Sequence, residues 1–414
     1  MMTLEIPKYP KEFIDAYVKL MICKYLDIIT SKSLLGRIQC YNKDIQKTFG
    51  YNGVSVVKCL IKEYYLHENY FNEITIYVAE QKTDLKEFVK KKLGTSNKNL
   101  LNKITTNSFK DYKQEDWYHD FVTQLNLLIK RKSQKIRNLV QEYKKENIND
   151  FRDYFRELIL IEPEYMDFYT QNPPIYQPPN FNNIKKLYNL SQEIEINGKL
   201  EKINTYMIRN FTNTDIKGLL VCPYCNRNYI NSRGKSFSAE MDHFYNKQDF
   251  PIFAISLYNF IPSCGTCNRL KGSKDLKINP YLKDETNNVT FDIIRDKESY
   301  QIKLKYKKNG ELVSIDTHPD LKNDLITVLK LDKAYKIHDI EVQEMMNREN
   351  EYGIEYRRLL KEMLQETDEE INKKVDTLIY GEVVFASENE LINKSLGKLK
   401  KDAYKKIKGW KISE

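Results

Sequence analysis

Two pairs of cysteines constrain this chain more than any other feature of its sequence. Each pair has the spacing Cys-x-x-Cys, and the pairs are Cys222/Cys225 and Cys264/Cys267. Two such pairs supply the four thiolates of a tetrahedral structural zinc site. Zinc bound by all four would close the segment between the pairs into one loop. The sequence therefore predicts a four-cysteine zinc site that gathers the polar residues of this loop into one place.

The rest of the composition is typical of a mostly helical chain. Its 414 residues include only 14 glycines and 12 prolines, the residues that interrupt helices most strongly. No uncharged apolar run is long enough to span a bilayer, and the first residues lack the basic and apolar regions of a signal peptide. We expect a cytoplasmic protein with no membrane partner. In that reducing compartment, paired cysteines are more often metal ligands than disulfides.

The chain is too long for one ordinary domain, and prolines mark its clearest boundary. Pro173-Pro174 and Pro178-Pro179 lie close together, and proline disfavours both helix and sheet at and before its position. We predict four parts: a helical N-terminal domain at 1–170, a proline-rich linker at 171–184, a cysteine-containing domain at 185–285, and a β-hairpin with helices at 286–414.

Apolar spacing predicts the elements before the cysteines. Apolar residues recur every three or four positions at 85–93 and 121–143, which predicts helices there. The segment 185–221 is expected to be a helical lead-in to the first cysteine pair.

After the cysteines, the apolar period changes to two. Alternating runs at 289–293 and 300–306 precede Asn309-Gly310, a strong hairpin signal. Helical spacing returns from about residue 320 and ends in a lysine-rich helix at about 388–410, which either faces an anionic partner or is a solvated terminal helix. The predicted fold class is α+β with a predominance of helices.

Polar residues inside the zinc loop form a second pattern. Asp242 and His243 are adjacent, Asn259 precedes the second cysteine pair, and Asn268 follows it directly. We predict a short strand ending at His243, a second strand through 260–261 and then a short helix. Adjacent residues of a strand point to opposite faces, so Asp242 and His243 act together only if the strand ends or bulges there.

These residue types meet the requirements of phosphodiester hydrolysis. That reaction needs a divalent metal, a base that is neutral near pH 7, and cationic groups for the phosphate oxygens. Asp242 and the amide oxygen of Asn268 suit Mg²⁺ or Mn²⁺, which prefer oxygen ligands. His243 is the one histidine in the sequence between the two cysteine pairs, so it is the expected general base. The cationic groups expected to contact the substrate phosphate are Arg269, Lys271 and Lys274.

The segment from Cys222 to about Leu282 closely resembles the HNH endonuclease family. The family pattern is an acid-x-Asp-His run, a central asparagine before the second cysteine pair, and Cys-x-x-Cys followed by His or Asn and a lysine. Glu240-Met-Asp-His243, Asn259 and Cys264-Gly-Thr-Cys267-Asn-Arg-Leu-Lys271 match it in order and spacing. The resemblance implies a ββα-metal module at the centre of the 185–285 domain.

The resemblance also implies roles for these residues. His243 would be the general base, Asp242 and Asn268 would hold the one catalytic metal, and Asn259 would brace the loop that orients the base. The four cysteines would hold a structural zinc. Asn246 stands where the family often has proline, which predicts a looser loop.

The run from Asp242-His-Phe through Pro251, Asn259, Cys264 and Cys267-Asn268 to Asn279-Pro280 is similar to the HNH subunits of bacterial anti-phage systems of the Septu and retron-linked kinds, where long helical flanks are common. This similarity implies a defence effector that cuts nucleic acid, DNA being expected, under the control of an ATPase or another subunit. The net charge of +9 fits an anionic partner, but it also fits the lysine-rich translation of an AT-rich genome. The alternative is a zinc-stabilised nucleic-acid-binding or regulatory subunit without catalysis.

Overall fold

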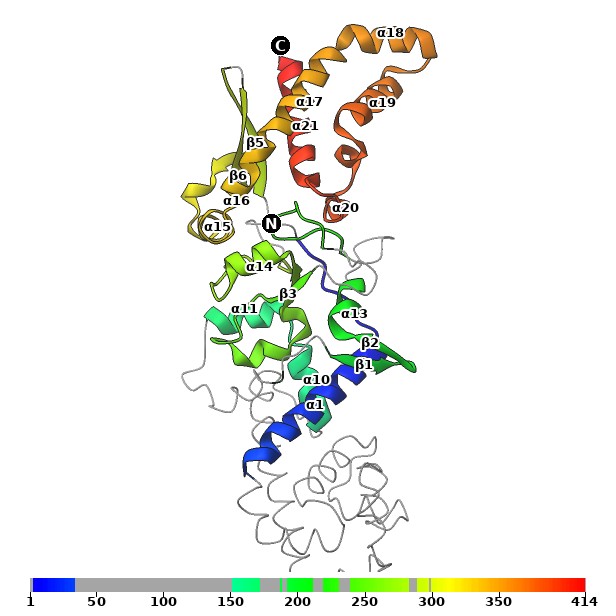
Figure 1. Cartoon of the computed structure of the whole chain (residues 1–414). Helices are drawn as coiled ribbons and strands as arrows, with labels where there is room; N and C mark the ends of the chain where they lie inside the picture. Colours follow the sequence, from blue (N-terminus) through cyan, green and yellow to red (C-terminus); the bar gives the residue numbers. More distant parts are fainter. Residues whose placement is uncertain are drawn as a thin grey trace, which may run out of the picture.

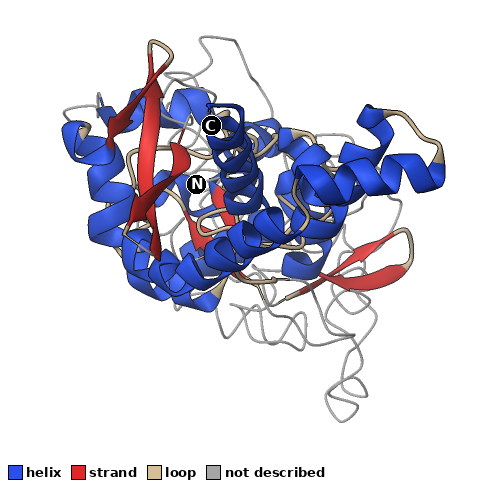
Figure 2. Cartoon of the chain, turned by 90° about the horizontal axis from the view of Figure 1, so that it is seen from above, coloured by secondary structure: helices blue, strands red, loops and turns tan. Residues whose placement is uncertain are grey.

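The computed structural model describes residues 3–33, 151–171, 187, 192–210, 219–230, 239–282, 289–297 and 299–413. The helices predicted at 85–93 and 121–143, and nearly all of the 171–184 linker, lie outside these residues. The described residues combine helices with three small antiparallel sheets, which confirms the α+β class (Figure 2). The boundaries between the four predicted parts stay predictions. None of the described helices is long and apolar enough to cross a membrane.

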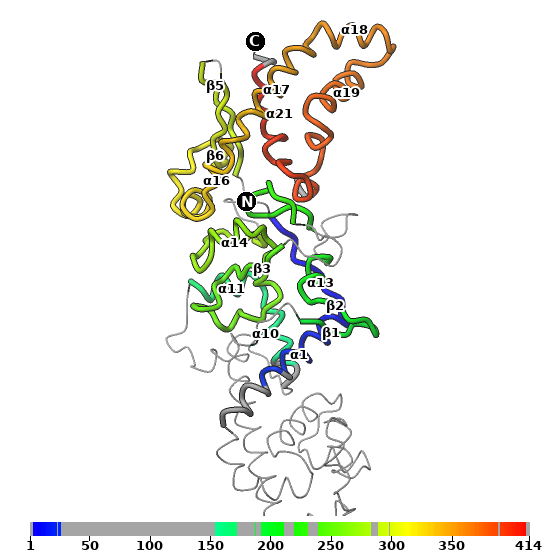
Figure 3. Tube along the Cα trace, in the orientation of Figure 1, coloured from blue at the N-terminus to red at the C-terminus, as the bar shows by residue number. Residues whose placement is uncertain are grey.

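The N-terminal helices pack against the centre of the molecule through aromatic rings. These helices are α1 (Lys11–Ser33), α10 (Phe151–Ile159) and α11 (Pro163–Gln171). Phe13 of α1 stacks on Tyr206 with ring centroids 4.7 Å apart, and Tyr169 of α11 meets Phe253 edge-on at 5.3 Å. The extended start of the chain lies beside the central module, where the Leu4 amide donates to the Pro280 carbonyl at 2.8 Å (Figure 3). The described N-terminal residues therefore share a core with this module.

The predicted helical lead-in at 185–221 is partly wrong. It contains an antiparallel hairpin of β1 (Glu193–Ile196) and β2 (Lys199–Lys202), followed by helix α13 (Ile203–Arg209). Asn197 and Gly198 make the turn with φ values of 51° and 75°. Both residues tolerate positive φ, and the strands on either side twist to match such a turn. The alternating Glu-Ile-Glu-Ile of β1 buries both isoleucines, as a half-buried strand does.

The central module has the predicted order of strand, strand and helix (Figure 1). Strand β3 (Glu240–His243) pairs antiparallel with β4 (Phe260–Ser263), with His243 opposite Phe260. Helix α14 (Gly265–Lys271) begins directly after β4. The link between the strands forms two short 3₁₀ helices, η1 (Pro251–Ile255) and η2 (Leu257–Asn259), whose apolar residues are almost all buried. Strand β3 ends at His243, as the sequence predicted.

The C-terminal part begins with a three-stranded meander and continues as helices. Strands β5 (Val289–Asp296), β6 (Ser299–Lys308) and β7 (Glu311–Ser314) are antiparallel, and Asn309-Gly310 makes the predicted β6–β7 turn with positive φ at both residues. The helices that follow are η4 (Ile315–Thr317), α15 (Pro319–Leu321), η5 (Lys322–Val328), α16 (Leu331–Tyr335), η6 (Lys336–His338), α17 (Asp339–Glu351), α18 (Ile354–Leu364), α19 (Asp368–Tyr380), η7 (Glu382–Phe385), α20 (Glu388–Leu391) and α21 (Gly397–Ser413).

The single helix predicted at about 388–410 is divided into α20 and α21. Helix α20 ends at Leu391. Leu396, just before α21, has a φ of 56°, and its amide donates to the Asn226 carbonyl at 2.7 Å. Helix α21 buries an apolar face against β5, and its lysines pair with acids, for example Lys406 with Asp292 at 2.9 Å. These pairings favour a packed terminal helix over a nucleic-acid-binding one.

Candidate functional site

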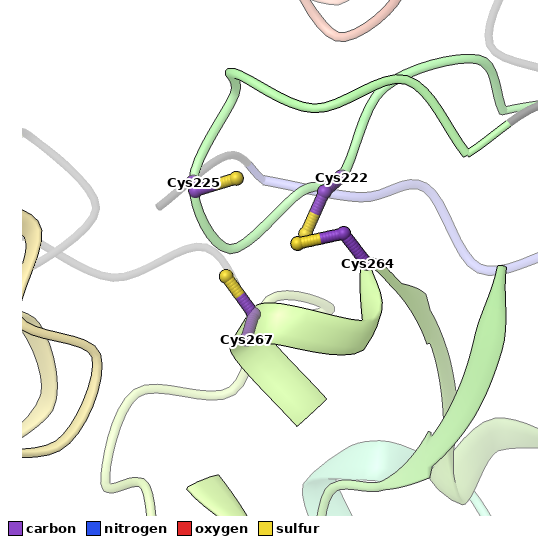
Figure 4. Close-up of side chains that lie close together, drawn as sticks. All are labelled: Cys222, Cys225, Cys264 and Cys267. Carbon is purple, nitrogen blue, oxygen red and sulfur yellow. The ribbon is translucent and has the colours of Figure 1, made fainter. Parts of the chain in front are cut away.

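The four cysteines predicted to bind zinc lie together and are buried. Their sulfur atoms are all within 4.8 Å of one another (Figure 4). Zinc–sulfur bonds of about 2.3 Å in a tetrahedron place sulfurs about 3.8 Å apart, so small movements would close the cluster around one ion. Burial raises the pKa of the Cys222 thiol. A divalent cation is what would stabilise the thiolate form in such a place. The cluster is therefore compatible with a structural zinc site.

Local backbone geometry brings the two pairs together. Cys222 and Cys225 lie on a hairpin over 219–230, which we call the zinc hairpin, and a β-bridge joins its Val221 and Tyr229. Asn226 follows the second cysteine with a φ of 48°, and its amide donates to the Cys222 carbonyl at 2.7 Å. Cys264 is the N-cap of α14, so Cys267 falls in the first turn of that helix.

Asp242 lies in a buried corner between β3, α14 and the zinc hairpin. Its Oδ2 accepts a hydrogen bond of 2.6 Å from the hydroxyl of Tyr224, and its Oδ1 pairs with the Lys271 ammonium at 3.1 Å. Burial raises the pKa of Asp242 to about 6, although Lys271 and Tyr224 oppose this shift. Burial also raises the pKa of Tyr224, so its hydroxyl remains a donor. The carboxylate is thus ionised at neutral pH and held by two donors.

His243 is the next residue, at the end of β3. Its ring Nε2 lies 3.1 Å from the Ala254 carbonyl oxygen, which only accepts, so Nε2 carries the hydrogen. Burial lowers the pKa of His243 to about 3, so the ring is neutral at pH 7. Nδ1 is then the basic nitrogen. The Lys271 ammonium donates to the His243 carbonyl at 2.7 Å and so ties this residue to Asp242.

Asn259 fastens the loop that supplies the Ala254 carbonyl. Its Oδ1 accepts from the Tyr245 amide at 2.8 Å, and its Nδ2 donates to the carbonyls of Tyr245 and Phe253 at 3.1 and 3.0 Å. The side chain is 0% exposed. One amide therefore joins both ends of the loop that begins after His243.

Asn268, which is expected to share the catalytic metal with Asp242, contacts Glu240 through its side-chain amide. Its Nδ2 donates to Glu240 Oε2 at 2.7 Å, and no hydrogen bond joins Asn268 to Asp242 in the part of the chain that the structure describes. Glu240 and Asp242 are two residues apart on β3, so their side chains lie on the same face of the strand. This spacing is the sequence signal that could have placed Glu240 in the site. A Cβ on Gly265 would lie 2.8 Å from Glu240 Oε1, so glycine is what lets Glu240 approach the start of α14.

Two expectations about single residues need correction. Lys271 is 0% exposed and bonded to the β3 end, so in this arrangement it cannot contact a substrate phosphate. It lies four residues after Cys267, on the inner face of α14. Arg269 and Lys274 are exposed, as expected. Asn246 does not loosen its loop, because its side chain bonds the Gln248 amide, the Asp249 carboxylate and the Ser273 carbonyl.

A scan against protein-family models and searches of curated proteins and solved structures return no match for this chain. Its function is therefore argued from the residues and geometry of the corner formed by β3, β4, α14 and the zinc hairpin.

Proposed function

We propose that the protein is a metal-dependent endonuclease of the HNH kind, which hydrolyses phosphodiester bonds in nucleic acid, DNA being the expected substrate. The observation that carries the proposal is the state of His243, a neutral imidazole held through Nε2 in the residue that directly follows the buried Asp242. A general base at pH 7 must be unprotonated and fixed in orientation, and both conditions are met here.

In the proposed reaction, Nδ1 of His243 takes a proton from a water molecule as the water oxygen attacks phosphorus. The bond from phosphorus to the 3′ oxygen breaks and that oxygen takes a proton from solvent water, which leaves a 5′-phosphate and a 3′-hydroxyl. The Ala254 carbonyl keeps the ring in place and stabilises the imidazolium that forms, since it accepts from Nε2 in both protonation states. Asn259 keeps Ala254 in place by fastening the loop on both sides of it.

The residues around Asp242 fit a hard divalent cation such as Mg²⁺ or Mn²⁺. Each Asp242 oxygen uses one lone pair on Tyr224 or Lys271 and keeps another. The Asn268 Nδ2 donates to Glu240, and no donor among the described residues contacts the Asn268 Oδ1. We expect Asp242 and Asn268 to hold the ion, with Glu240 beside them. When bound, the ion would supply positive charge for the phosphate and the leaving oxygen.

The experiment is cleavage of supercoiled plasmid by the purified chain with Mg²⁺ or Mn²⁺. We expect His243→Ala to abolish cleavage, whereas His318→Ala, a change at a helix cap of the C-terminal part, should leave it intact. A His243→Ala protein with full activity would refute the proposal. Binding of plasmid without cleavage by any divalent ion, equal in the wild type and His243→Ala, would instead support the non-catalytic binding module.

A further inference from the structure

Tyr224 connects the zinc hairpin to the proposed active site. It lies between the two cysteines of the first pair, and its side chain is 0% exposed. Its hydroxyl is 2.6 Å from Asp242 Oδ2, and this contact joins the zinc hairpin to β3. A residue inside the zinc-binding loop therefore touches the carboxylate that we expect to bind the catalytic metal.

The zinc hairpin is also anchored on its other side. The Asn226 side chain donates to the carbonyls of Leu391 and Lys394 at 3.0 and 3.3 Å and accepts from the Lys398 amide at 3.1 Å. The Tyr335 hydroxyl donates to the Cys225 carbonyl at 2.6 Å. The C-terminal part and the four-cysteine cluster together fix the backbone that carries Tyr224.

This anchoring matters because, among the residues that the structure describes, two donors hold the Asp242 carboxylate. Lys271 contacts one oxygen and Tyr224 contacts the other. Lys271 is a point charge on a flexible stem, so it specifies little about the plane of the carboxylate. A phenol on a rigid ring approaches from one direction only. Hydrogen bonds of this kind to a metal-binding carboxylate commonly set its orientation and the metal affinity.

We propose that Tyr224 is a positioning residue, through which the zinc hairpin holds the Asp242 carboxylate in the orientation that binds the catalytic metal. The inference rests on the proposed function. Its consequence is that the zinc hairpin, and the C-terminal part that anchors it, act on the Asp242 carboxylate through the Tyr224 hydroxyl. Removing that hydroxyl should lower the affinity for the catalytic metal without changing the zinc content.

The test compares the full-length wild type with Tyr224→Phe, which removes the hydroxyl and keeps the ring. The matched control is Tyr229→Phe on the same hairpin, where the ring is 60% exposed. Zinc content is measured by inductively coupled plasma mass spectrometry, and Mn²⁺ affinity by electron paramagnetic resonance. Cleavage is measured by plasmid nicking at several Mn²⁺ concentrations. For Tyr224→Phe we expect unchanged zinc content, Mn²⁺ affinity lower by about 10-fold, and cleavage that recovers as Mn²⁺ is raised. Tyr229→Phe should match the wild type throughout.

Two results would overturn the inference while leaving the proposed function intact. One is a Tyr224→Phe protein that retains zinc and binds Mn²⁺ as the wild type does. The other is a Tyr224→Phe protein that loses zinc together with Mn²⁺, because Tyr224 would then be a structural residue of the hairpin. A wild type that neither binds Mn²⁺ nor cuts nucleic acid would overturn the proposed function, and the inference with it.

Discussion

Replacing Asn259 by alanine should destabilise the central module more than most single substitutions. The side chain makes three hydrogen bonds, one accepted from the Tyr245 amide and two donated to the carbonyls of Tyr245 and Phe253. Alanine would leave all three backbone groups without this partner, in a site that is 0% exposed. At about 1 kcal/mol for each bond, the free energy of unfolding should fall by about 3 kcal/mol, and the cavity left behind adds to this loss.

Asn259→Asp separates hydrogen bonding from volume. The aspartate keeps the shape of asparagine and the acceptor for the Tyr245 amide, but it places an oxygen opposite two carbonyl oxygens. At pH 7 it should therefore be at least as destabilising as alanine. The control is Asn347→Ala on the exposed face of α17, which should change the free energy by less than about 0.5 kcal/mol.

The measurement is urea unfolding of the full-length, zinc-loaded protein, followed by circular dichroism. Amide hydrogen exchange at Tyr245 reports the same loss locally, since its amide donates to Asn259 Oδ1. An Asn259→Ala protein within about 1 kcal/mol of the wild type, with Tyr245 protection unchanged, would refute the bracing role.

Three further predictions concern charge and metal. The pKa of His243 is lowered to about 3, so the unfolded chain binds a proton below pH 6.5 that the folded chain excludes. Relative to His243→Gln, the wild type should therefore lose about 2 kcal/mol of stability between pH 7 and pH 5 in urea titrations, and a flat difference would contradict the burial argument. Lys271→Met should lower stability by about 3 kcal/mol or more because it leaves the buried Asp242 carboxylate without its cationic partner, whereas exposed Lys274→Met should have little effect on the melting temperature. Stripping zinc with a strong chelator, or changing Cys267 to Ser, should unfold the cleft in circular dichroism, while removal of Mg²⁺ alone should stop cleavage and leave the spectrum unchanged.

Turn chemistry shows how far local patterns predict this fold. Asn309-Gly310 predicted the β6–β7 turn, because both residues tolerate the positive φ that such a turn requires. Asn197-Gly198 carries the same signal and makes the β1–β2 turn. The prediction of helix there was wrong because the strands are only four residues long, and the charged residues around them mimic a helix surface.

Long-range contacts explain why the final helix is divided. Residues 388–410 have continuous helical spacing, and local propensity alone favours one helix. The zinc hairpin overrides that propensity, because Asn226 needs partners for its buried amide and finds them in the backbone of 391–398. A buried polar group without a partner costs more than a break between two short helices.

The sequence by itself determined the four-cysteine cluster, the order of strand, strand and helix, and the end of β3 at His243. The spacing within each Cys-x-x-Cys pair identifies the metal ligands, and the strands and helix depend on patterns within short segments. Only the tertiary structure decided which side chains meet. Lys271, expected to contact a phosphate, is instead buried and paired with Asp242. Asn268 contacts Glu240, and the Tyr224 hydroxyl contacts the Asp242 carboxylate. Buried polar groups pair with whichever groups are buried beside them. Because these partners are far apart in the chain, only the packed tertiary structure brings them together.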